Sequence, residues 1–200
     1  MKTYTPISTA ENTLIESVEN GTPLRVLQTD NTKDLEVLQA KSIEIDPKDN
    51  ALKKLITRMY NTVADENKPG VGIAAPQIGV NRRVFLAQRL DKTEHPFEFF
   101  INPEIVWQSK ILRKGGEGCL SIADTYEAVY RSYVIQMTYF DLEGTQFHEV
   151  IEGFTAVIMQ HEMDHLNGIL FTDRIEEQKN NQYFSASADN ELFYLSSNLE

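Results

Sequence analysis

The sequence predicts an α+β fold in which mostly antiparallel sheets surround a central helix. Two segments have helical periodicity, and segments rich in β-branched and aromatic residues precede and follow them. Two of these strand-like segments flank Asp141-Leu142-Glu143-Gly144, which is typical of a hairpin turn. A chain of 200 residues is long enough for one domain with a sizeable core.

The first helix is expected over about 47–65. Asp46 and Pro47 suit the cap and the first turn of a helix, and Asn67-Lys68-Pro69-Gly70 follows its end. Apolar residues between these limits recur at helical spacing: Leu52, Leu55, Ile56, Met59, Tyr60 and Val63.

The second helix is expected over 153–167, and Gly168 stands where a left-handed cap would end it. Strands are expected over five segments, bounded by turn residues: 83–88, 97–102, 104–109, 134–141 and 145–151.

Composition excludes several classes of function. The net charge of −11 argues against binding to nucleic acid or to anionic membranes, because both need an excess of lysine and arginine. No apolar run is long enough to span a membrane, and the first residues contain no apolar signal segment. The single cysteine, Cys119, cannot form an internal disulfide. We therefore expect a cytoplasmic protein.

The second helix contains the pattern His-Glu-x-x-His. His161 and His165 are four residues apart, so they share one face and can bind one metal ion, and Glu162 can serve as the base for a water molecule. Apolar residues precede them on the same face, so both imidazoles are expected to point to the interior, where they would be costly without a partner. The sequence therefore predicts a central metal-binding helix. These apolar residues are Phe154, Val157 and Ile158.

Two other segments are unusually rich in small residues. Residues 70–79 contain three glycines and present one polar side chain, Gln77; alone, this segment is typical of a tight loop. Residues 115–121 place Cys119 in what we expect to be a glycine-rich loop rather than a strand. This cysteine is either a small buried apolar residue or a thiolate ligand or nucleophile.

Taken together, the three motifs resemble those of the peptide deformylases. The patterns are GxGxAAxQ, EGCLS and QHExDHLxG, in this order and at this spacing. Leu24-Arg25, Asn102-Pro103 and Arg131 also resemble family positions, and the resemblance covers about residues 23–175. It implies a catalytic domain over 23–175, an N-terminal arm over 1–22 and an acidic tail over 176–200.

The resemblance implies a metal-dependent hydrolase that removes the N-formyl group from the N-terminal methionine of newly synthesised polypeptides and releases formate. One divalent ion is expected, Fe²⁺ in the cell, with Zn²⁺, Ni²⁺ or Co²⁺ possible in the purified protein. We expect a monomer whose partner is an N-formylmethionyl peptide. The implied metal ligands are Cys119, His161 and His165. The implied catalytic groups are Glu162, Gln77 and the backbone N–H of Leu120.

Other residues are expected to bind the substrate or to support the metal ligands. Gly72 and Ile73 would pair with an extended peptide, and Phe154, Val157 and Ile158 would surround the methionine side chain; each of these three is about equally suited to a plain core role. Glu117 and Arg131 would form a supporting ion pair. The chain also departs from the family: Ala123 stands where many members have proline, and Tyr126 where some have a basic residue.

Two alternatives remain open. One is a zinc metalloprotease of the His-Glu-x-x-His type, which would need a third ligand downstream, and Asp173 and Glu176 are available. The other is a relative that binds peptides without catalysis, although every expected catalytic position is filled.

Overall fold

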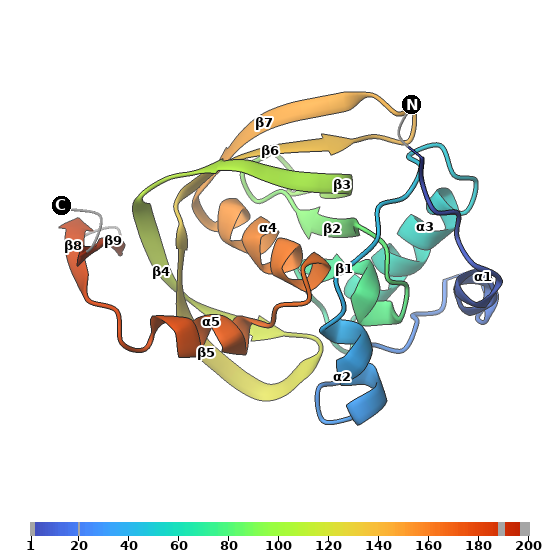
Figure 1. The fold of residues 1–200 in the computed structure, drawn as a ribbon, viewed down its shortest axis with the longest axis horizontal. Helices are drawn as coiled ribbons and strands as arrows, with labels where there is room; N and C mark the ends of the chain where they lie inside the picture. The colour runs from blue at the N-terminus through green and yellow to red at the C-terminus, as the bar shows by residue number, and fades with distance from the viewer. Residues whose placement is uncertain (1–2, 20, 188–190, 197–200) are drawn as a thin grey trace.

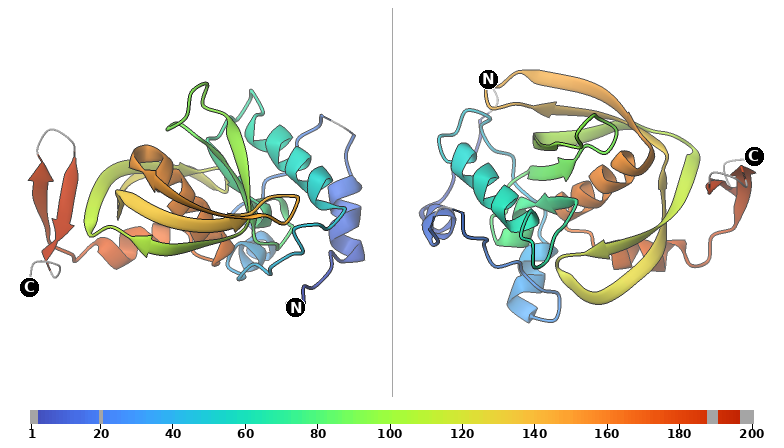
Figure 2. Two further views of the ribbon diagram at one scale, coloured as in Figure 1. Left: turned by 90° about the horizontal axis from the view of Figure 1, so that it is seen from above. Right: turned by 180° about the vertical axis from the view of Figure 1, so that it is seen from behind.

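The computed structural model describes residues 3–19, 21–187 and 191–196. Within them the chain forms an α+β fold with two antiparallel sheets, and helix α4 (Gly153–Leu166) lies between the sheets (Figure 1). The helices near the N-terminus lie at one end of the molecule and a C-terminal hairpin at the other (Figure 2). The predicted α+β class with antiparallel sheets is therefore confirmed.

The five-stranded sheet has the order β1-β2-β3-β6-β7. The hairpin predicted at Asp141–Gly144 joins β6 to β7, and Asp141 N–H donates to the Thr145 carbonyl. One face of this sheet packs on α4 through buried apolar residues, among them Ile135, Met137 and Ile151. The strands are β1 (Gly72–Ala74), β2 (Val84–Gln88), β3 (Phe97–Gln108), β6 (Val134–Phe140) and β7 (Gln146–Glu152).

The two strands expected over 97–102 and 104–109 are one strand, β3. Its register against β6 shifts between Ile101 and Glu104, and Asn102 has a positive φ of 46°. The Asn102 side chain bonds the backbone N–H and carbonyl of Ile45 at 3.0 and 2.7 Å, which holds this bend. The break at Asn102-Pro103 is thus an irregularity within a strand, because proline lacks the N–H needed for regular pairing.

The second sheet has the order β5-β4-β9-β8. The expected glycine-rich loop over 115–121 was wrong: most of it is strand, and Cys119 is the last residue of β4. Glycine weakens a strand only modestly, and continuous pairing with β5 compensates for it here. The strands are β4 (Ile111–Cys119), β5 (Ile122–Ser132), β8 (Tyr183–Ser187) and β9 (Leu192–Leu195).

Helix α3 (Leu52–Val63) begins five residues later than predicted. Asp46 accepts the Lys48 N–H at 3.0 Å in a tight turn instead of capping a helix, and Asp49 accepts the Ala51 N–H at 2.9 Å in the next. Most of the apolar face of α3 is buried as expected, but Ile56 is only partly buried and Tyr60 is about half exposed.

The N-terminal residues are joined closely to the domain. Helix α1 (Thr9–Glu16) begins with a capping box between Ser8 and Glu11, and its Ile15 side chain is buried. Two buried arginines donate to backbone carbonyls of this segment: Arg58 to residues 15, 18 and 19, and Arg82 to residues 5 and 6. The remaining helical elements are α2 (Thr32–Leu38), η1 (Ala75–Ile78) and α5 (Phe171–Gln178).

The end of α4 agrees with the prediction to within one residue. Gly168 has a φ of 71°, and a Cβ added there would lie 2.3 Å from the Gln39 carbonyl oxygen. Only glycine fits both the left-handed conformation and this close approach.

Candidate active site

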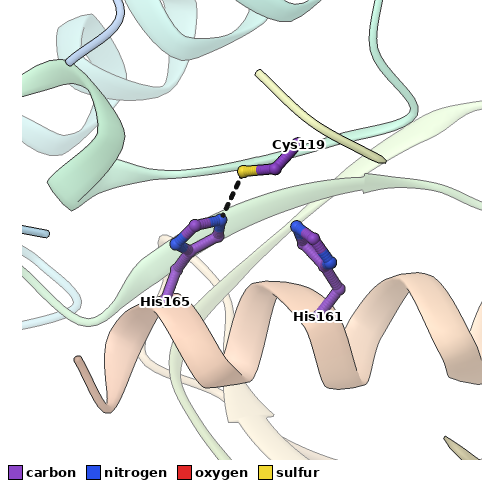
Figure 3. Close-up of side chains that lie close together, drawn as sticks. All are labelled: Cys119, His161 and His165. Carbon is purple, nitrogen blue, oxygen red and sulfur yellow. Dashed lines mark hydrogen bonds between the residues drawn. The ribbon is translucent and has the colours of Figure 1, made fainter. Parts of the chain in front are cut away.

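Three side chains that can bind a metal converge between β4 and α4 (Figure 3). The ligand atoms of Cys119, His161 and His165 all lie within 4.8 Å of one another, and Cys119 Sγ is 3.2 Å from His165 Nε2. Cys119 ends β4, whereas the two histidines lie one turn apart on α4. The structure thus brings together the three residues that the sequence suggested as ligands.

Glu117 orients the first of these histidines. Its Oε2 lies 2.8 Å from His161 Nδ1, so the other ring nitrogen is free to face Cys119. Both Glu117 oxygens also accept hydrogen bonds from Arg131, at 2.8 and 2.9 Å. Burial tends to raise the pKa of Glu117, but its bonds with Arg131 and His161 lower it to about 2. This carboxyl group is therefore charged at neutral pH.

The electrostatics of the three residues favour a cation. Burial opposes charge on His161, yet its interactions with Cys119 and Glu117 raise its pKa to about 10. Burial also opposes a thiolate at Cys119, but His165 and His161 bring its pKa well below the usual value. The Cys119 thiolate and the Glu117 carboxylate stabilise positive charge at this place, so they would also stabilise a divalent ion. One sulfur and two imidazole ligands leave one tetrahedral position open, as in catalytic metal sites.

Glu162 follows His161 on α4 and its side chain is buried. Burial raises its pKa to about 7, against the opposing effect of His161 and His165, and its Oε2 has no hydrogen-bond partner among the described residues. A Cβ added at Gly72 would lie 2.4 Å from Glu162 Oε1. Gly72 therefore leaves the space that this carboxyl group occupies.

Gln77 is held with its amide NH₂ toward the sulfur. Its Oε1 accepts the Ala74 N–H at 2.8 Å, which leaves Nε2 to lie 3.5 Å from Cys119 Sγ and 3.2 Å from Ser121 Oγ. The Ser121 N–H also donates to Cys119 Sγ, at 3.4 Å. The sequence analysis did not single out Ser121, although it belongs to the EGCLS motif.

Leu120 is held by two donors that the sequence did not indicate. Its carbonyl accepts hydrogen bonds from Gln28 Nε2 at 3.0 Å and from Lys68 Nζ at 2.9 Å. Both partners are far from Leu120 in the chain, so no local pattern could have identified them.

A cleft of about 410 Å³ opens beside these groups. Gly72 and the three apolar residues of α4 line it together with Cys119, His161 and Glu162. Ile73 is different: its side chain is fully buried in the core, so only its backbone is available to a peptide. The α4 residues concerned are Phe154, Val157 and Ile158.

The support behind the ligands is wider than the expected ion pair. Arg131 contacts Asp164 as well as Glu117, and Arg174 binds the same Asp164 at 2.6 and 3.0 Å. Asp164 is a variable position of His-Glu-x-x-His but a specified one of the QHExDHLxG motif, and the sequence analysis assigned it no role.

A Cys-His-His group that can hold a metal ion, with a buried glutamate beside it, is typical of metal-dependent hydrolases. Residues 24–181 match the family model described as polypeptide deformylase. The peptide deformylase of Caulobacter sp. (strain K31) is 38% identical over 162 residues, which cover 80% of this chain and 92% of that protein. That of Pseudomonas aeruginosa is 38% identical over 140 residues, 70% of this chain and 80% of that protein.

Solved structures of peptide deformylases have a similar fold. The K3U-bound class I type b peptide deformylase from Acinetobacter baumannii superposes with a TM-score of 0.70 at 35% identity, covering 77% of this chain and 99% of that one. The Thermotoga maritima peptide deformylase has a TM-score of 0.68 at 33% identity, covering 76% and 97%. The chain belongs to the polypeptide deformylase family, and its activity is the metal-dependent removal of the N-formyl group from newly synthesised polypeptides. Among the described residues, no helix is long and apolar enough to cross a membrane.

Proposed function

We propose that Cys119, His161 and His165 hold the catalytic metal ion and that α4 is therefore the metal-binding helix of the fold. The observation that carries this proposal is the convergence of the three ligand atoms within 4.8 Å of one another, beside a cleft that Cys119 and His161 line. We propose Fe²⁺ as the native ion, with Zn²⁺, Ni²⁺ or Co²⁺ able to replace it, because one sulfur and two nitrogen ligands suit all four.

Glu162 is proposed to move the proton. When bound, a divalent ion polarises the formyl carbonyl and lowers the pKa of water. Glu162 accepts the proton of the attacking water and delivers it to the leaving amine, which becomes the free N-terminus while formate departs. Its pKa of about 7 supports both roles, since the group can gain and lose a proton near neutral pH.

Gln77 and Leu120 are proposed to stabilise the developing oxyanion. The Gln77 amide is fixed by the Ala74 N–H, so its NH₂ group needs no reorientation during the reaction. The backbone N–H of Leu120 would be the second donor, on a segment anchored through the Leu120 carbonyl. Losing one such donor typically raises the barrier by about 3 kcal/mol.

The peptide is proposed to lie extended along β1. This strand is at the edge of its sheet, so backbone groups of Gly72 and Ile73 are available for strand addition. The methionine side chain would occupy the apolar part of the cleft beside Phe154, Val157 and Ile158. Arg131 and Glu117 would keep His161 in place from behind.

We further propose that residues 23–175 form the catalytic domain, with 1–22 as an arm and 176–200 as a tail. The substrate is made on ribosomes, which supports action in the cytoplasm, and we propose that the enzyme acts as a monomer.

The metalloprotease alternative has less support. Asp173 accepts the Leu170 N–H at 2.8 Å as part of the start of α5, and Glu176 pairs with Lys179. Neither belongs to the cluster that can bind a metal within the described residues.

The test is formate release by anaerobically purified protein from formyl-Met-Ala-Ser, with metal analysis of the same sample. We expect turnover by the native protein and a loss of about a hundredfold or more in Glu162→Gln, with the metal retained. Glu176→Gln, which alters an exposed glutamate outside the cleft, is the matched control. Full metal occupancy without formate release would overturn the proposal, as would equal cleavage of an internally quenched, unformylated peptide.

A further inference from the structure

Tyr126 is an unusually exposed aromatic residue at the wall of the catalytic cleft. Its side chain is 75% exposed, yet it lines the cleft together with Leu120 and Phe154. No hydrogen bond, ion pair or ring contact holds this side chain anywhere in the described part of the chain. A ligand group that covered this ring would remove apolar surface from water, which favours binding.

The strand beneath the ring is shaped to receive it. A Cβ added at Gly116 would lie 2.4 Å from Tyr126 Cε1, and one added at Gly118 would lie 3.4 Å from its Cδ2. Both glycines belong to β4, and Gly118 is the register partner of Tyr126 on β5. Neither glycine has a positive φ, so backbone conformation does not require glycine at these positions. The absence of side chains allows the Tyr126 ring to lie against β4.

The ring lies away from the groups that do the chemistry. Cys119, His161 and Glu162 come from the end of β4 and from α4, whereas Gly116 lies three residues earlier on β4. A peptide with its formyl group beside Glu162 and its methionine beside the α4 residues must direct its later residues elsewhere along the cleft. Outside α4, the exposed apolar side chains of the cleft include Val71, the residue before β1, and Tyr126 itself.

We infer that Tyr126 is a specificity-determining residue: its ring, lying on Gly116 and Gly118, contacts the side chain of one of the two residues that follow formyl-methionine and favours aromatic or large apolar residues there. This inference rests on the proposed orientation of the peptide in the cleft. An aromatic contact of this kind adds to binding in the ground state and the transition state alike, so it lowers KM and leaves kcat unchanged.

The experiment compares kcat/KM for formyl-Met-Phe-Ser and formyl-Met-Ala-Phe with that for formyl-Met-Ala-Ser. We expect the native enzyme to prefer at least one phenylalanine peptide, and Tyr126→Ala to reduce that preference about two- to tenfold through KM. Tyr126→Phe keeps the ring and should keep the preference. Phe184→Ala, which removes an exposed aromatic side chain on β8 outside the cleft, is the matched control and should change nothing.

Gly116→Ala gives an independent test, because the added methyl group displaces the ring without removing it. It should reduce the same preference as Tyr126→Ala. Unchanged ratios in both variants, with formyl-Met-Ala-Ser still turned over, would overturn the role of Tyr126 and leave the deformylase activity standing. Absence of formate from every peptide with the native enzyme would instead contradict the proposed catalytic site.

Discussion

Two buried arginines organise two ionic clusters in this molecule, and only one of them contacts the catalytic site. Arg131 and Arg89 are both about 4–5% exposed in their side chains, and each makes a two-bond contact with one carboxylate, Glu117 or Asp91. Glu117 goes on to bond His161, whereas the Arg89 cluster extends to Glu98 and Glu149 and, through Glu98, to Lys92.

The surroundings of the partners differ as well. The carboxylates around Arg131 are 5–7% exposed, and those around Arg89 are 26–30% exposed. Removing one partner of a buried ion pair leaves a charge that water cannot reach, but a partly exposed carboxylate is rehydrated easily. The free-energy cost of breaking an arginine–carboxylate pair therefore depends on how exposed the carboxylate is. Its function depends on whether the carboxylate also bonds a residue of the site, as Glu117 bonds His161.

The largest expected effect is that of Arg131→Met. It leaves Glu117 and Asp164 buried without their shared cation, so we expect a loss of about 3–5 kcal/mol in the free energy of unfolding. Arg89→Met should cost less, because solvent reaches its partners, and should leave kcat/KM unchanged. Urea unfolding and formate release measure both quantities. Equal losses of stability and activity in the two variants would remove the distinction between the clusters.

Glu117→Gln tests whether the Arg131 cluster, unlike the Arg89 cluster, supports metal binding. The side chain keeps its shape but loses the charge that makes His161 a strong ligand, so metal affinity should fall about 10- to 100-fold. Competition with a chelator of known affinity measures this. Glu98→Gln makes the same change beside Arg89 and should leave metal affinity unaltered; a fall there would show that the effect is not local to His161.

Local patterns in the sequence predicted the parts of this arrangement that depend on near neighbours. The histidines of α4 and the β6–β7 hairpin follow from periodicity and turn residues close together in the chain. The capping box of Ser8 and Glu11 is also a local pattern, but no helix was predicted there because the segment is polar. Of the contacts in the two arginine clusters, the sequence analysis expected only the Glu117–Arg131 pair, through the family resemblance. The other contacts could not be predicted, because Arg131 and Asp164 are 33 residues apart and Arg89 and Glu149 are 60 apart.

The strand that holds Cys119 was missed for a different reason. Gly115, Gly116 and Gly118 have low strand propensity, and only their pairing with β5 makes the segment a strand. Pairing with β5 therefore overrides the low strand propensity of this glycine-rich segment.

The pH dependence of stability should separate the clusters in metal-free protein. The pKa of Glu117 in the folded state, about 2, is below its ordinary value of 4.5, so its contribution is complete above pH 4.5 and is lost as the pH falls toward 2. The stability difference between the native protein and Glu117→Gln should therefore shrink over that interval. Other carboxyl groups with lowered pKa values, such as Glu11, cancel in this difference. A difference that does not depend on pH would contradict the ionic role of Glu117.

For Asp91, the hydrogen bonds with Arg89 lower the pKa more than burial raises it, so the pKa lies below its ordinary value of 3.8. As for Glu117, the contribution of Asp91 to stability is lost as the pH falls, but the loss begins at a lower pH, below about 3.8. The matching comparison of the native protein with Asp91→Asn should therefore be constant down to that pH. Thermal unfolding followed by circular dichroism at a series of pH values measures both differences.

The smallest effects are expected from the outer cation of each cluster. Arg174 binds Asp164 from the solvent side and is 29% exposed, while Lys92 binds Glu98 at 2.8 and 3.0 Å and is 39% exposed. Arg174→Met leaves Asp164 paired with Arg131, and Lys92→Met leaves Glu98 paired with Arg89, so each should cost about 1 kcal/mol or less. Neither should alter metal affinity, because neither touches Glu117 or His161. Weaker metal binding in Arg174→Met would mean that Asp164 transmits the outer charge to the site, and the boundary of the catalytic support would then lie at Arg174 instead of Arg131.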